Sequence, residues 1–577
     1  MSFVDLFCKN RANLLFIQPK TSYYEYRSNS MQTLGMDELN SPNLSALVVE
    51  QQSLAQSHIK YSLQHLGLER IDFVDRAHLA IEALQKRQYQ IILCAYQLNK
   101  GSDGFQLFEK MSKQGLIPAS TTFIFMSSEN DISLSQSVIE LEPDDFLLKP
   151  FTSKELEVRI NRVLSKKIAL QPIFNCIEMG DVTGAIDLVD KQISDNEHPN
   201  WLSYLVKLKG NILKKTKDWS RIEAFYLSVL KIKYFSWAQL GLVESYIQLG
   251  KYAEAKRILE DLLENPATKL QALDLLSTIH EQNKEFEQAL SHLKTACILS
   301  PRNIERQQHL VDIARITQDF ESQYTASGSI VKHLRHSMYE VPSLYLNAIR
   351  ANIDYGLTTF NDTEMQRLAQ QSQHILDNLK RKFPKVPLDE QIDVATARIH
   401  YLKNESDKAK HLLKLKTDKS KDYIVEDLED ALDYAKALHE VGFHNDSINV
   451  FEEIAKQAEQ STNHLFSLYI SAEKQLRKEV RDSPKVINNN AVSFYTRGKL
   501  NEALNAFKTA FRIMPKSPAI ALNLLQTVAE SQFLDFTSKE VQSLVEQCKS
   551  TINASTLSDE QSVRFAKIQS SLLEERV

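Results

Sequence analysis

The run Tyr89-Gln-Ile-Ile-Leu-Cys-Ala95-Tyr-Gln-Leu-Asn-Lys-Gly-Ser-Asp-Gly104 decides the fold of the first part of this chain. Its apolar segment, from Ile91 to Ala95, is too short for a helix and is followed by the turn-forming residues Gly-Ser-Asp-Gly. A short apolar segment of this kind is typical of a central strand buried on both faces of a parallel sheet. Open α/β sheets bind ligands at the carboxyl ends of such strands, so we expect a site just after Ala95.

Three more short apolar runs surround this strand, and each ends in a polar residue. They are Ala46-Leu-Val-Val-Glu50, Phe123-Ile-Phe-Met-Ser127 and Phe146-Leu-Leu-Lys149-Pro150. Amphipathic helical patterns alternate with the strands, at about Leu54–His65, Arg76–Arg87, Phe105–Gln114, Ile132–Glu140 and Ser153–Lys166. This alternation predicts right-handed βα units and a parallel sheet. Ser153 is the expected amino-terminal cap of the last of these helices.

The four strand ends place Glu50, Ala95, Ser127 and Lys149 at one edge of the sheet. This layout, over residues 44–166, resembles the receiver domain of bacterial response regulators, an α/β (flavodoxin-like) domain with a five-stranded parallel sheet. In that family the first strand ends in two acids that hold Mg²⁺ and the third in the aspartate that accepts a phosphoryl group. The fourth strand ends in Ser or Thr, and the fifth in Lys-Pro.

The site that the resemblance implies lacks its nucleophile. Gln51 stands where the second acid belongs, and Ala95 occupies the place of the phosphoacceptor. A methyl group cannot form an acyl phosphate, and Mg²⁺ is held largely by carboxylates. We therefore expect a degenerate receiver with no catalytic residue, metal or cofactor. Its remaining site residues are Glu50, Gln51, Ala95, Ser127, Phe146 and Lys149.

Lys149 raises a physical question, because the resemblance pairs it with the missing aspartate. Deleting one partner of a buried ion pair costs about 3 to 5 kcal/mol, so we expect Lys149 to turn to Glu50 or the site to be open to water. Phe146 falls where receivers carry the aromatic residue that swings inward on activation, although a core residue is the favoured interpretation. Asp103 precedes a glycine and is interpreted as a turn residue.

From about Ile168 onward the strands vanish and pairs of amphipathic helices recur. The clearest pair, from Asn488 to Pro515, resembles the tetratricopeptide repeat, a helix-turn-helix unit with a period of 34 residues. Two further units match in register, because Ala255 and Ala289 are 289 − 255 = 34 residues apart. We expect tetratricopeptide-type repeats at 167–338, irregular helical repeats at 339–484, and a repeat with capping helices at 485–577, which together form an all-α solenoid.

Length and composition restrict the function classes. A chain of 577 residues is too long for one hydrophobic core, and a formal net charge of −5 argues against general nucleic-acid binding. The five cysteines are scattered without a C-x-x-C pair, which favours a reducing cytoplasm over a disulfide framework or zinc site. Residues 1–43 are expected to be a disordered extension, with Met31 or Met36 as alternative starts, and to contain no membrane span.

The expected function is recognition without reaction. We interpret the chain as a cytoplasmic signalling adaptor of the response-regulator type, with a phosphorylation-independent receiver and a protein-binding repeat array. The alternatives are a phosphorelay response regulator with an atypical phosphosite, and a transcriptional regulator. Asn488 and Asn489 are the candidate contacts to a peptide, and a dimer through the receiver stays open. A lysine run could meet an acidic partner, although a solvated surface is favoured: Lys408, Lys410, Lys414, Lys416, Lys419 and Lys421.

Overall fold

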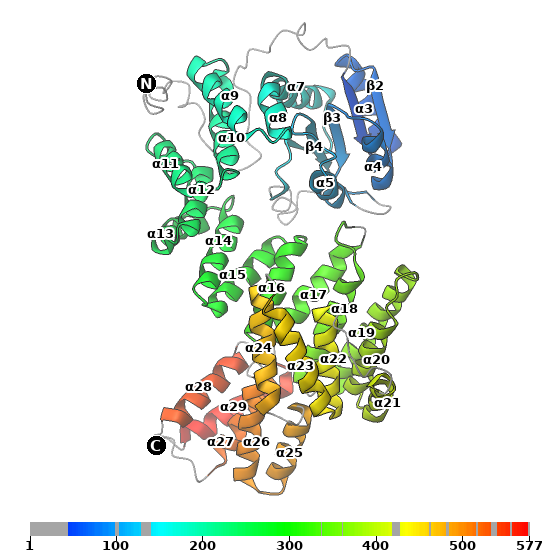
Figure 1. Cartoon of the computed structure of the whole chain (residues 1–577), viewed down its shortest axis with the longest axis vertical. Coiled ribbons are helices and arrows are strands. Elements are labelled where there is room, and N and C mark those ends of the chain that lie inside the picture. The colour runs from blue at the N-terminus through cyan, green and yellow to red at the C-terminus, as the bar shows by residue number, and fades with distance from the viewer. Residues whose placement is uncertain are drawn as a thin grey trace. The chain divides into compact units, whose positions relative to one another are not determined.

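The structure is a computed structural model in which two compact units are distinguished (Figure 1). The amino-terminal unit comprises residues 1–303 and 334–339, and the carboxy-terminal unit comprises 304–333 and 340–577. The described residues are 44–98, 103–128, 140–335, 337–359, 362–417, 427–460, 463–479, 484–514, 517–531, 539–553 and 557–574. The expected extension at 1–43 and all of the helix expected at Ile132–Glu140 except its last residue therefore lie outside the described residues.

An α/β domain opens the amino-terminal unit, and its five strands are all parallel in the order β2-β1-β3-β4-β5. The strands are β1 (Ser45–Val49), β2 (Arg70–Val74), β3 (Ile91–Ala95), β4 (Thr122–Ser127) and β5 (Asp145–Leu148). The expected fold class is confirmed. The strand β2 is not one of the apolar runs of the sequence, because Arg-Ile-Asp-Phe-Val alternates polar and apolar residues. This alternation is expected for an edge strand that is not fully buried.

The central strands are buried on both faces, as their uninterrupted apolar sequences predict. One face packs against α3 (Ser53–His65) and α7 (Ser153–Ala169), through residues such as Ile59 and Ile160. The opposite face packs against α4 (Ala77–Lys86) and α5 (Gly104–Lys113), through residues such as Ala80 and Leu107. Alternate residues of each strand thus supply two separate cores, which fixes the register of the sheet.

The cap expected at Ser153 is wrong by one residue. Thr152 is the N-cap of α7: its hydroxyl accepts a hydrogen bond from the backbone N–H of Glu155, whose carboxylate accepts one from the backbone N–H of Thr152. The Ser153 hydroxyl instead lies 3.2 Å from Nε2 of His58. Thr152 takes the cap position because it has Glu three residues later, which completes a capping box.

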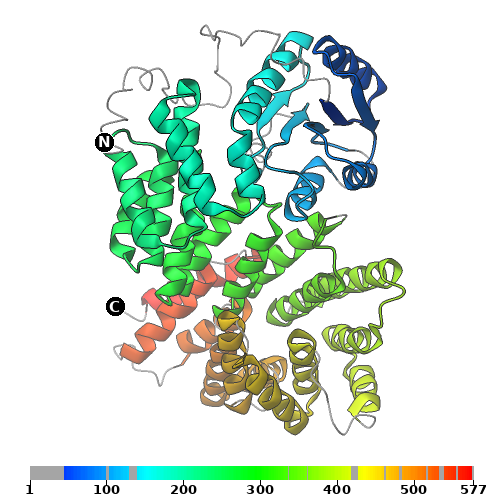
Figure 2. The same cartoon turned by 45° about the horizontal axis from the view of Figure 1, so that its top comes forward.

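Helices alone make up the described part of the chain after β5. In the amino-terminal unit they stack as antiparallel pairs (Figures 1 and 2). They are α8 (Gln171–Glu178), α9 (Val182–Asp195), α10 (Leu202–Lys214), α11 (Trp219–Leu230), α12 (Ser236–Gln248), α13 (Tyr252–Leu263), α14 (Lys269–Gln282) and α15 (Phe286–Leu299), with a short 3₁₀ turn at Pro199–Trp201. The boundary expected after residue 166 falls inside α7, which continues to Ala169.

The carboxy-terminal unit continues the helical pairs. Its helices are α16 (Ile304–Ile316), α17 (Phe320–Leu334), α18 (Pro342–Thr359), α19 (Asp362–Lys382), α20 (Asp389–Leu402), α21 (Ser406–Thr417), α22 (Leu428–Val441), α23 (His444–Ala458), α24 (His464–Glu479), α25 (Pro484–Thr496), α26 (Leu500–Ile513), α27 (Pro518–Ala529), α28 (Lys539–Asn553) and α29 (Asp559–Glu574). None of the described helices combines the length and the apolar composition that crossing a bilayer requires.

Eight turns between paired helices in the described residues have a left-handed residue two positions before the second helix. Glycine fills this position at Gly180, Gly250, Gly442 and Gly498, where φ lies between 72° and 95°. Other residues fill it with φ between 54° and 66°: Lys217, Lys284, Gln318 and Asn404. The conformation favours glycine, because a side chain in the left-handed region crowds its own backbone. The repeated geometry therefore persists in pairs whose sequence does not indicate it.

Small residues let neighbouring helices approach closely in the amino-terminal unit. Tyr226, which is 1% exposed, lies between Gly210 of α10 and Gly241 of α12. A Cβ atom on Gly241 would lie 2.2 Å from Cζ of Tyr226, and one on Gly210 would lie 2.7 Å from its hydroxyl. These two glycines thus supply the space that the tyrosine ring fills.

A buried ion network crosses the carboxy-terminal unit. Arg398 of α20 is 1% exposed and donates to Asp433 at 2.6 Å, to Asp354 at 2.7 Å and to Glu440 at 2.5 Å. Lys436 donates to the other oxygen of Asp354, at 2.7 Å. The network joins three helices that are separated in the sequence: α18, α20 and α22.

Candidate functional site

The carboxyl ends of four strands meet at one edge of the sheet, as the sequence predicts. The register pairs Val49 with Cys94, Ala95 with Met126 and Ser127 with Leu148, so the residues that follow these strands are neighbours. We call the set Glu50, Gln51, Ala95, Ser127, Phe146 and Lys149 the edge site.

Glu50 is the anchor of the edge site and is 2% exposed. One carboxylate oxygen accepts the backbone N–H groups of Gln51 and Gln52, both at 3.0 Å. The other carboxylate oxygen lies 2.5 Å from Nζ of Lys149, whose side chain is 20% exposed. The expectation that Lys149 turns to Glu50 is confirmed. Both oxygens of this carboxylate are therefore engaged within the chain.

Ala95 ends β3 with its methyl group almost fully buried, at 2% exposure. The next loop returns closely over it: Gly104 donates its N–H to the carbonyl of Tyr96 at 2.8 Å, and a Cβ on Gly104 would lie 2.3 Å from the carbonyl oxygen of Ala95. Sequence reasoning interpreted Asp103-Gly104 as a turn and missed this close approach. Burial raises the pKa of the neighbouring Cys94 thiol, with the carboxylates of Asp103 and Glu50 adding to the effect, so it stays protonated.

The remaining edge-site residues hold the strands together. Ser127 is 2% exposed, and its carbonyl accepts the backbone N–H of Lys149 at 2.7 Å. Phe146 is partly buried and packs against the core cluster that contains Ala95 and Tyr96. This placement agrees with the interpretation of Phe146 as a core residue.

Several known proteins are similar to this domain. A family model described as the response regulator receiver domain matches residues 46–161. Residues 46–161 form a response regulator receiver domain. The transcriptional regulatory protein LytR of Staphylococcus aureus (strain N315) is 30% identical over 125 residues, which cover 22% of this chain and 48% of that protein. The chain thus spans about half the length of this relative.

Further similarities cover other shares of the chain. The transcriptional regulatory protein CrdR of Helicobacter pylori (strain ATCC 700392 / 26695) is 29% identical over 171 residues, 29% of this chain and 75% of that protein. The solved receiver domain of an HD domain-containing protein from Pseudomonas fluorescens Pf-5 is 24% identical over 22% of this chain and 91% of its own, with a TM-score of 0.20. The Cut9–Hcn1 hetero-tetramer of the APC/C is 11% identical over 71% of this chain and 91% of its own, with a TM-score of 0.27.

The edge site of the receiver domain does not fit the Mg²⁺ ion that the family implies. Gln51 offers an amide in place of a carboxylate, and both oxygens of Glu50 already accept hydrogen bonds or the Lys149 ammonium. Mg²⁺ demands several oxygen ligands in near-octahedral geometry, usually including carboxylates. Across the described residues, no cluster of three or more His, Cys, Asp or Glu is arranged to hold a metal ion.

The two asparagines predicted as peptide contacts differ in their exposure to solvent. Asn488 of α25 is 4% exposed, and its side-chain carbonyl accepts a hydrogen bond from Asn523 of α27 at 3.2 Å. It joins two helices, so the prediction that it contacts a bound peptide is wrong for this residue. The signal for an exposed contact was weak because asparagine amides serve packing equally well. Asn489 is exposed and stays a predicted contact.

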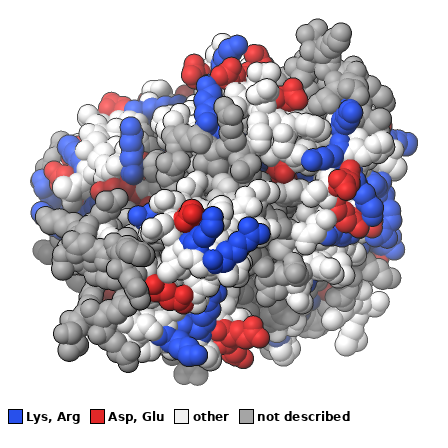
Figure 3. All heavy atoms as spheres, turned by 90° about the horizontal axis from the view of Figure 1, so that it is seen from below, with Lys and Arg blue, Asp and Glu red and all other residues white. Residues whose placement is uncertain are grey.

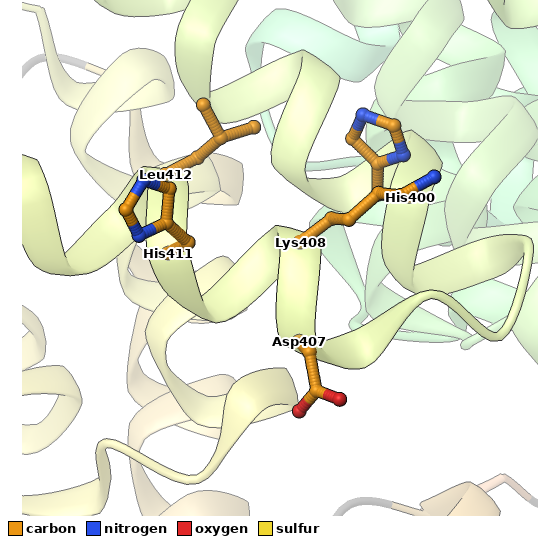
Figure 4. A pocket seen from close by; sticks show the side chains of 5 residues that line it. All are labelled: His400, Asp407, Lys408, His411 and Leu412. Carbon is orange, nitrogen blue, oxygen red and sulfur yellow. The ribbon is translucent and has the colours of Figure 1, made fainter.

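The lysine run begins at a shallow cavity of the carboxy-terminal unit. The cavity has a volume of 430 Å³ and lies between α20 and α21, lined by His400, Asp407, Lys408, His411 and Leu412 (Figure 4). Asp407 points away from the other labelled side chains. Lys408 is paired with Glu405 at 2.9 Å, and Lys410 and Lys414 are exposed. The side chains of Lys416, Lys419 and Lys421 lie outside the described residues.

Proposed function

We propose that this chain is a cytoplasmic signalling adaptor of the two-component type. In this proposal the receiver domain works without phosphorylation at its edge site, and the helical array binds a protein partner as tetratricopeptide-type repeats do. The single observation that carries the proposal is Ala95, whose buried methyl group stands at the end of β3 with no oxygen to accept a phosphoryl group.

The ion pair at the edge site supports the same proposal. Nζ of Lys149 lies 2.5 Å from a carboxylate oxygen of Glu50, which takes the place of the missing aspartate as its partner. The positive charge of the lysine is therefore already compensated. A compensated lysine does not attract an incoming phosphoryl group as strongly as an unpaired one. The receiver domain then serves as a structural and docking module.

The helical array supports a binding role. Its pairs repeat one turn geometry, and 284 − 250 = 34 and 318 − 284 = 34 residues separate three of the left-handed positions. Stacked helix pairs of this period present an extended surface to other proteins. Three of the described cysteines, Cys94, Cys176 and Cys548, are free thiols, which supports the cytoplasmic part of the proposal.

A phosphodonor experiment on the full chain tests this proposal. The purified protein is incubated with acetyl phosphate and Mg²⁺, and the intact mass is measured. We expect no adduct on the wild-type chain, whereas the double variant Gln51→Asp and Ala95→Asp restores both acids and serves as the positive control. Stoichiometric labelling of the wild-type receiver domain would overturn the proposal in favour of an atypical phosphosite. Affinity capture with the full chain as bait tests the array, which we expect to retain a protein partner.

Transcriptional control is the second candidate, because the relatives LytR and CrdR are named transcriptional regulatory proteins. Direct DNA contact predicts retention that falls steeply as salt rises. On the face shown in Figure 3, basic and acidic side chains of the described residues are interspersed, and no continuous basic surface is visible. A gel-shift series from low to high salt separates this candidate from the adaptor.

A further inference from the structure

Three acidic side chains of the receiver domain contact the helical array of the amino-terminal unit, in addition to contacts such as that of Ser120 with Glu178. We call Asp103, Glu140 and Glu142 the acidic rim. Glu140 accepts hydrogen bonds from the Ser300 hydroxyl at 2.7 Å and from the Asn303 amide at 2.6 Å. Asp103 forms an ion pair with Arg302, and Glu142 forms one with Lys207, at 3.3 Å. We call Lys207, Ser300, Arg302 and Asn303 the donor set.

The donor set comes from two distant parts of the array. Lys207 lies in α10, whereas the other three donors lie in the turn between α15 and α16, at least 300 − 207 = 93 residues later. The acidic rim therefore bridges the beginning and the end of the helices from α10 to α15. A contact that spans several repeats holds their curvature, because each repeat otherwise touches only its neighbours.

The donor set is built for carboxylates. The Ser300 hydroxyl and the Asn303 amide each donate to one oxygen of the Glu140 carboxylate. The Arg302 guanidinium donates to Asp103 and lies 5.5 Å from the ring centroid of Tyr96. Ser300 is fully buried. Charge-assisted hydrogen bonds of this kind are stronger than neutral ones. The occupant is itself a peptide segment with acids two residues apart, Glu140 and Glu142.

The contacts also reach the edge site. Tyr96 directly follows Ala95, donates its N–H to Met126 at 2.8 Å and packs its ring against Phe125. Arg302 covers this tyrosine and lies 6.0 Å from the ring centroid of Phe105, at the start of α5. The strand end at residue 95 and the donor set thus share one contiguous group of side chains.

We propose that the acidic rim is an intramolecular occupant of the donor set, and that the external ligand of this set is an acidic peptide segment of a partner protein. The inference rests on the proposed function and names the chemistry of the partner. The ligand carries two carboxylates at positions i and i+2 and binds when the rim leaves. The side chains of Glu142 and Lys207 are 60% and 40% exposed, and those of Asp103 and Arg302 are 26% and 33% exposed, so an external peptide can compete for these two pairs.

The size of the effect follows from population shift. When an internal segment occupies a site, the apparent dissociation constant of the external ligand equals the intrinsic constant divided by the fraction of molecules in which the site is open. If the rim occupies the donor set in about nine of ten molecules, removing it tightens binding about tenfold.

The test uses the full chain and a fluorescein-labelled peptide with the sequence of residues 138–146, measured by fluorescence anisotropy. The release variant combines Asp103→Asn, Glu140→Gln and Glu142→Gln. Asparagine retains the N-cap of α5, because it caps helices as well as aspartate does. The matched control combines Glu69→Gln, Glu82→Gln and Glu260→Gln, which change the charge equally at exposed positions.

We expect the release variant to bind the peptide about tenfold more tightly than the control, and Arg302→Ala with Asn303→Ala in the release background to reverse the gain. Equal binding by release variant and control overturns the inference, as does equal binding of a peptide with glutamines in place of the acids, or of a labelled DNA duplex.

Hydrogen exchange on the wild-type chain gives a second measurement that needs no variant. Saturating peptide should speed exchange of the backbone amides at residues 103–107, because Asp103 loses Arg302. Unchanged exchange with bound peptide overturns the inference. The phosphodonor and capture experiments fail independently of these measurements, so the two proposals are distinguishable.

Discussion

The helices α10 to α15 and the helices α18 to α24 share one turn geometry but have different interiors. Lys217, Lys284 and Asn404 adopt the same left-handed conformation in the two regions. The first region buries apolar residues, and none of the buried side chains between residues 170 and 303 is charged. The second region buries Arg350, Asp354, Arg398, Asp433 and Lys436.

This difference shows that local helix-turn-helix geometry does not determine what the array encloses. In the first region Tyr226 fills the space between two glycines, so the helices pack through complementary shapes of apolar side chains. In the second region the interior is closed by ion pairs such as Arg398 with Asp354. A buried charge is tolerated only when paired, so the second region depends on every member of its network.

The chain offers a way to measure the two regions separately. Its three tryptophans, Trp201, Trp219 and Trp237, all lie in the amino-terminal unit, so their fluorescence reports that unit. Far-ultraviolet circular dichroism reports helices of both units. Urea unfolding followed by both signals therefore assigns a loss of stability to one unit.

The largest expected effect comes from Arg398→Ala. The change leaves three carboxylates without their shared partner, which should lower the free energy of unfolding by about 3 to 5 kcal/mol. The circular dichroism transition should move to lower urea while the tryptophan transition stays. Arg497→Ala removes an exposed arginine of the same unit and should change stability by less than about 0.5 kcal/mol. Equal effects of the two variants would show that the network contributes nothing.

The second largest expected effect is a difference between the two regions in how their stability falls at acidic pH. Burial alone would raise the pKa of Asp354, but Lys436 and Arg398 outweigh it and hold this pKa below its usual value. A depressed carboxylate pKa stabilises the fold above the unfolded-state value of about 4, and this stability is lost as pH falls through the folded-state value. The slope approaches about 1.4 kcal/mol per pH unit for each proton taken up.

The measurement is the urea midpoint at pH 5, 4 and 3. The circular dichroism component of the carboxy-terminal unit should fall more steeply than the tryptophan component. Burial raises the pKa of Glu440 despite Arg398, so this group acts in the opposite direction and reduces the net slope. Parallel loss of both signals would contradict the role assigned to the network.

Gly241→Ala should destabilise the first region. The added methyl group would lie 2.2 Å from Cζ of Tyr226, and overpacking of this kind costs about 1 to 3 kcal/mol. The tryptophan transition should shift. Gly328→Ala is the control: it lies in α17 of the carboxy-terminal unit, has no atom within 4 Å of its added Cβ, and should stabilise that unit by up to about 1 kcal/mol, as followed by circular dichroism. The same sign for both variants would refute the packing argument.

The smallest expected effect comes from Lys284→Gly. The exposed lysine has φ +60°, so glycine relieves backbone crowding and should stabilise the amino-terminal unit by about 0.5 to 1 kcal/mol. Gly250→Ala is the reciprocal change at φ +72°, with open space around the new Cβ, and should destabilise by a similar amount. The tryptophan midpoint checks both, and a loss for Lys284→Gly would show that its side chain contributes more than its backbone conformation costs.

Much of the receiver domain was predictable from the sequence, because strands buried on both faces need uninterrupted apolar runs. Ile91–Ala95 is both the predicted and the observed strand. The pairing of Lys149 with Glu50 was also predictable, because a buried ammonium requires a partner and few acids are near. The cap at Thr152 was missed by one residue, since adjacent Thr and Ser offer the same chemistry and the carboxylate of Glu155 selects between them.

The amino-acid sequence by itself determined where strands end, where helices pair and that residue 95 has no acceptor oxygen, since these properties belong to short stretches of chain. Tertiary structure alone decided which charges are buried: Arg398 meets acids 44 and 35 residues away, at Asp354 and Asp433, and Arg302 meets Asp103 across 199 residues. Periodicity assigns such side chains to solvent, because nothing local reveals a partner. Their energy depends on distances that exist only after the helices have stacked.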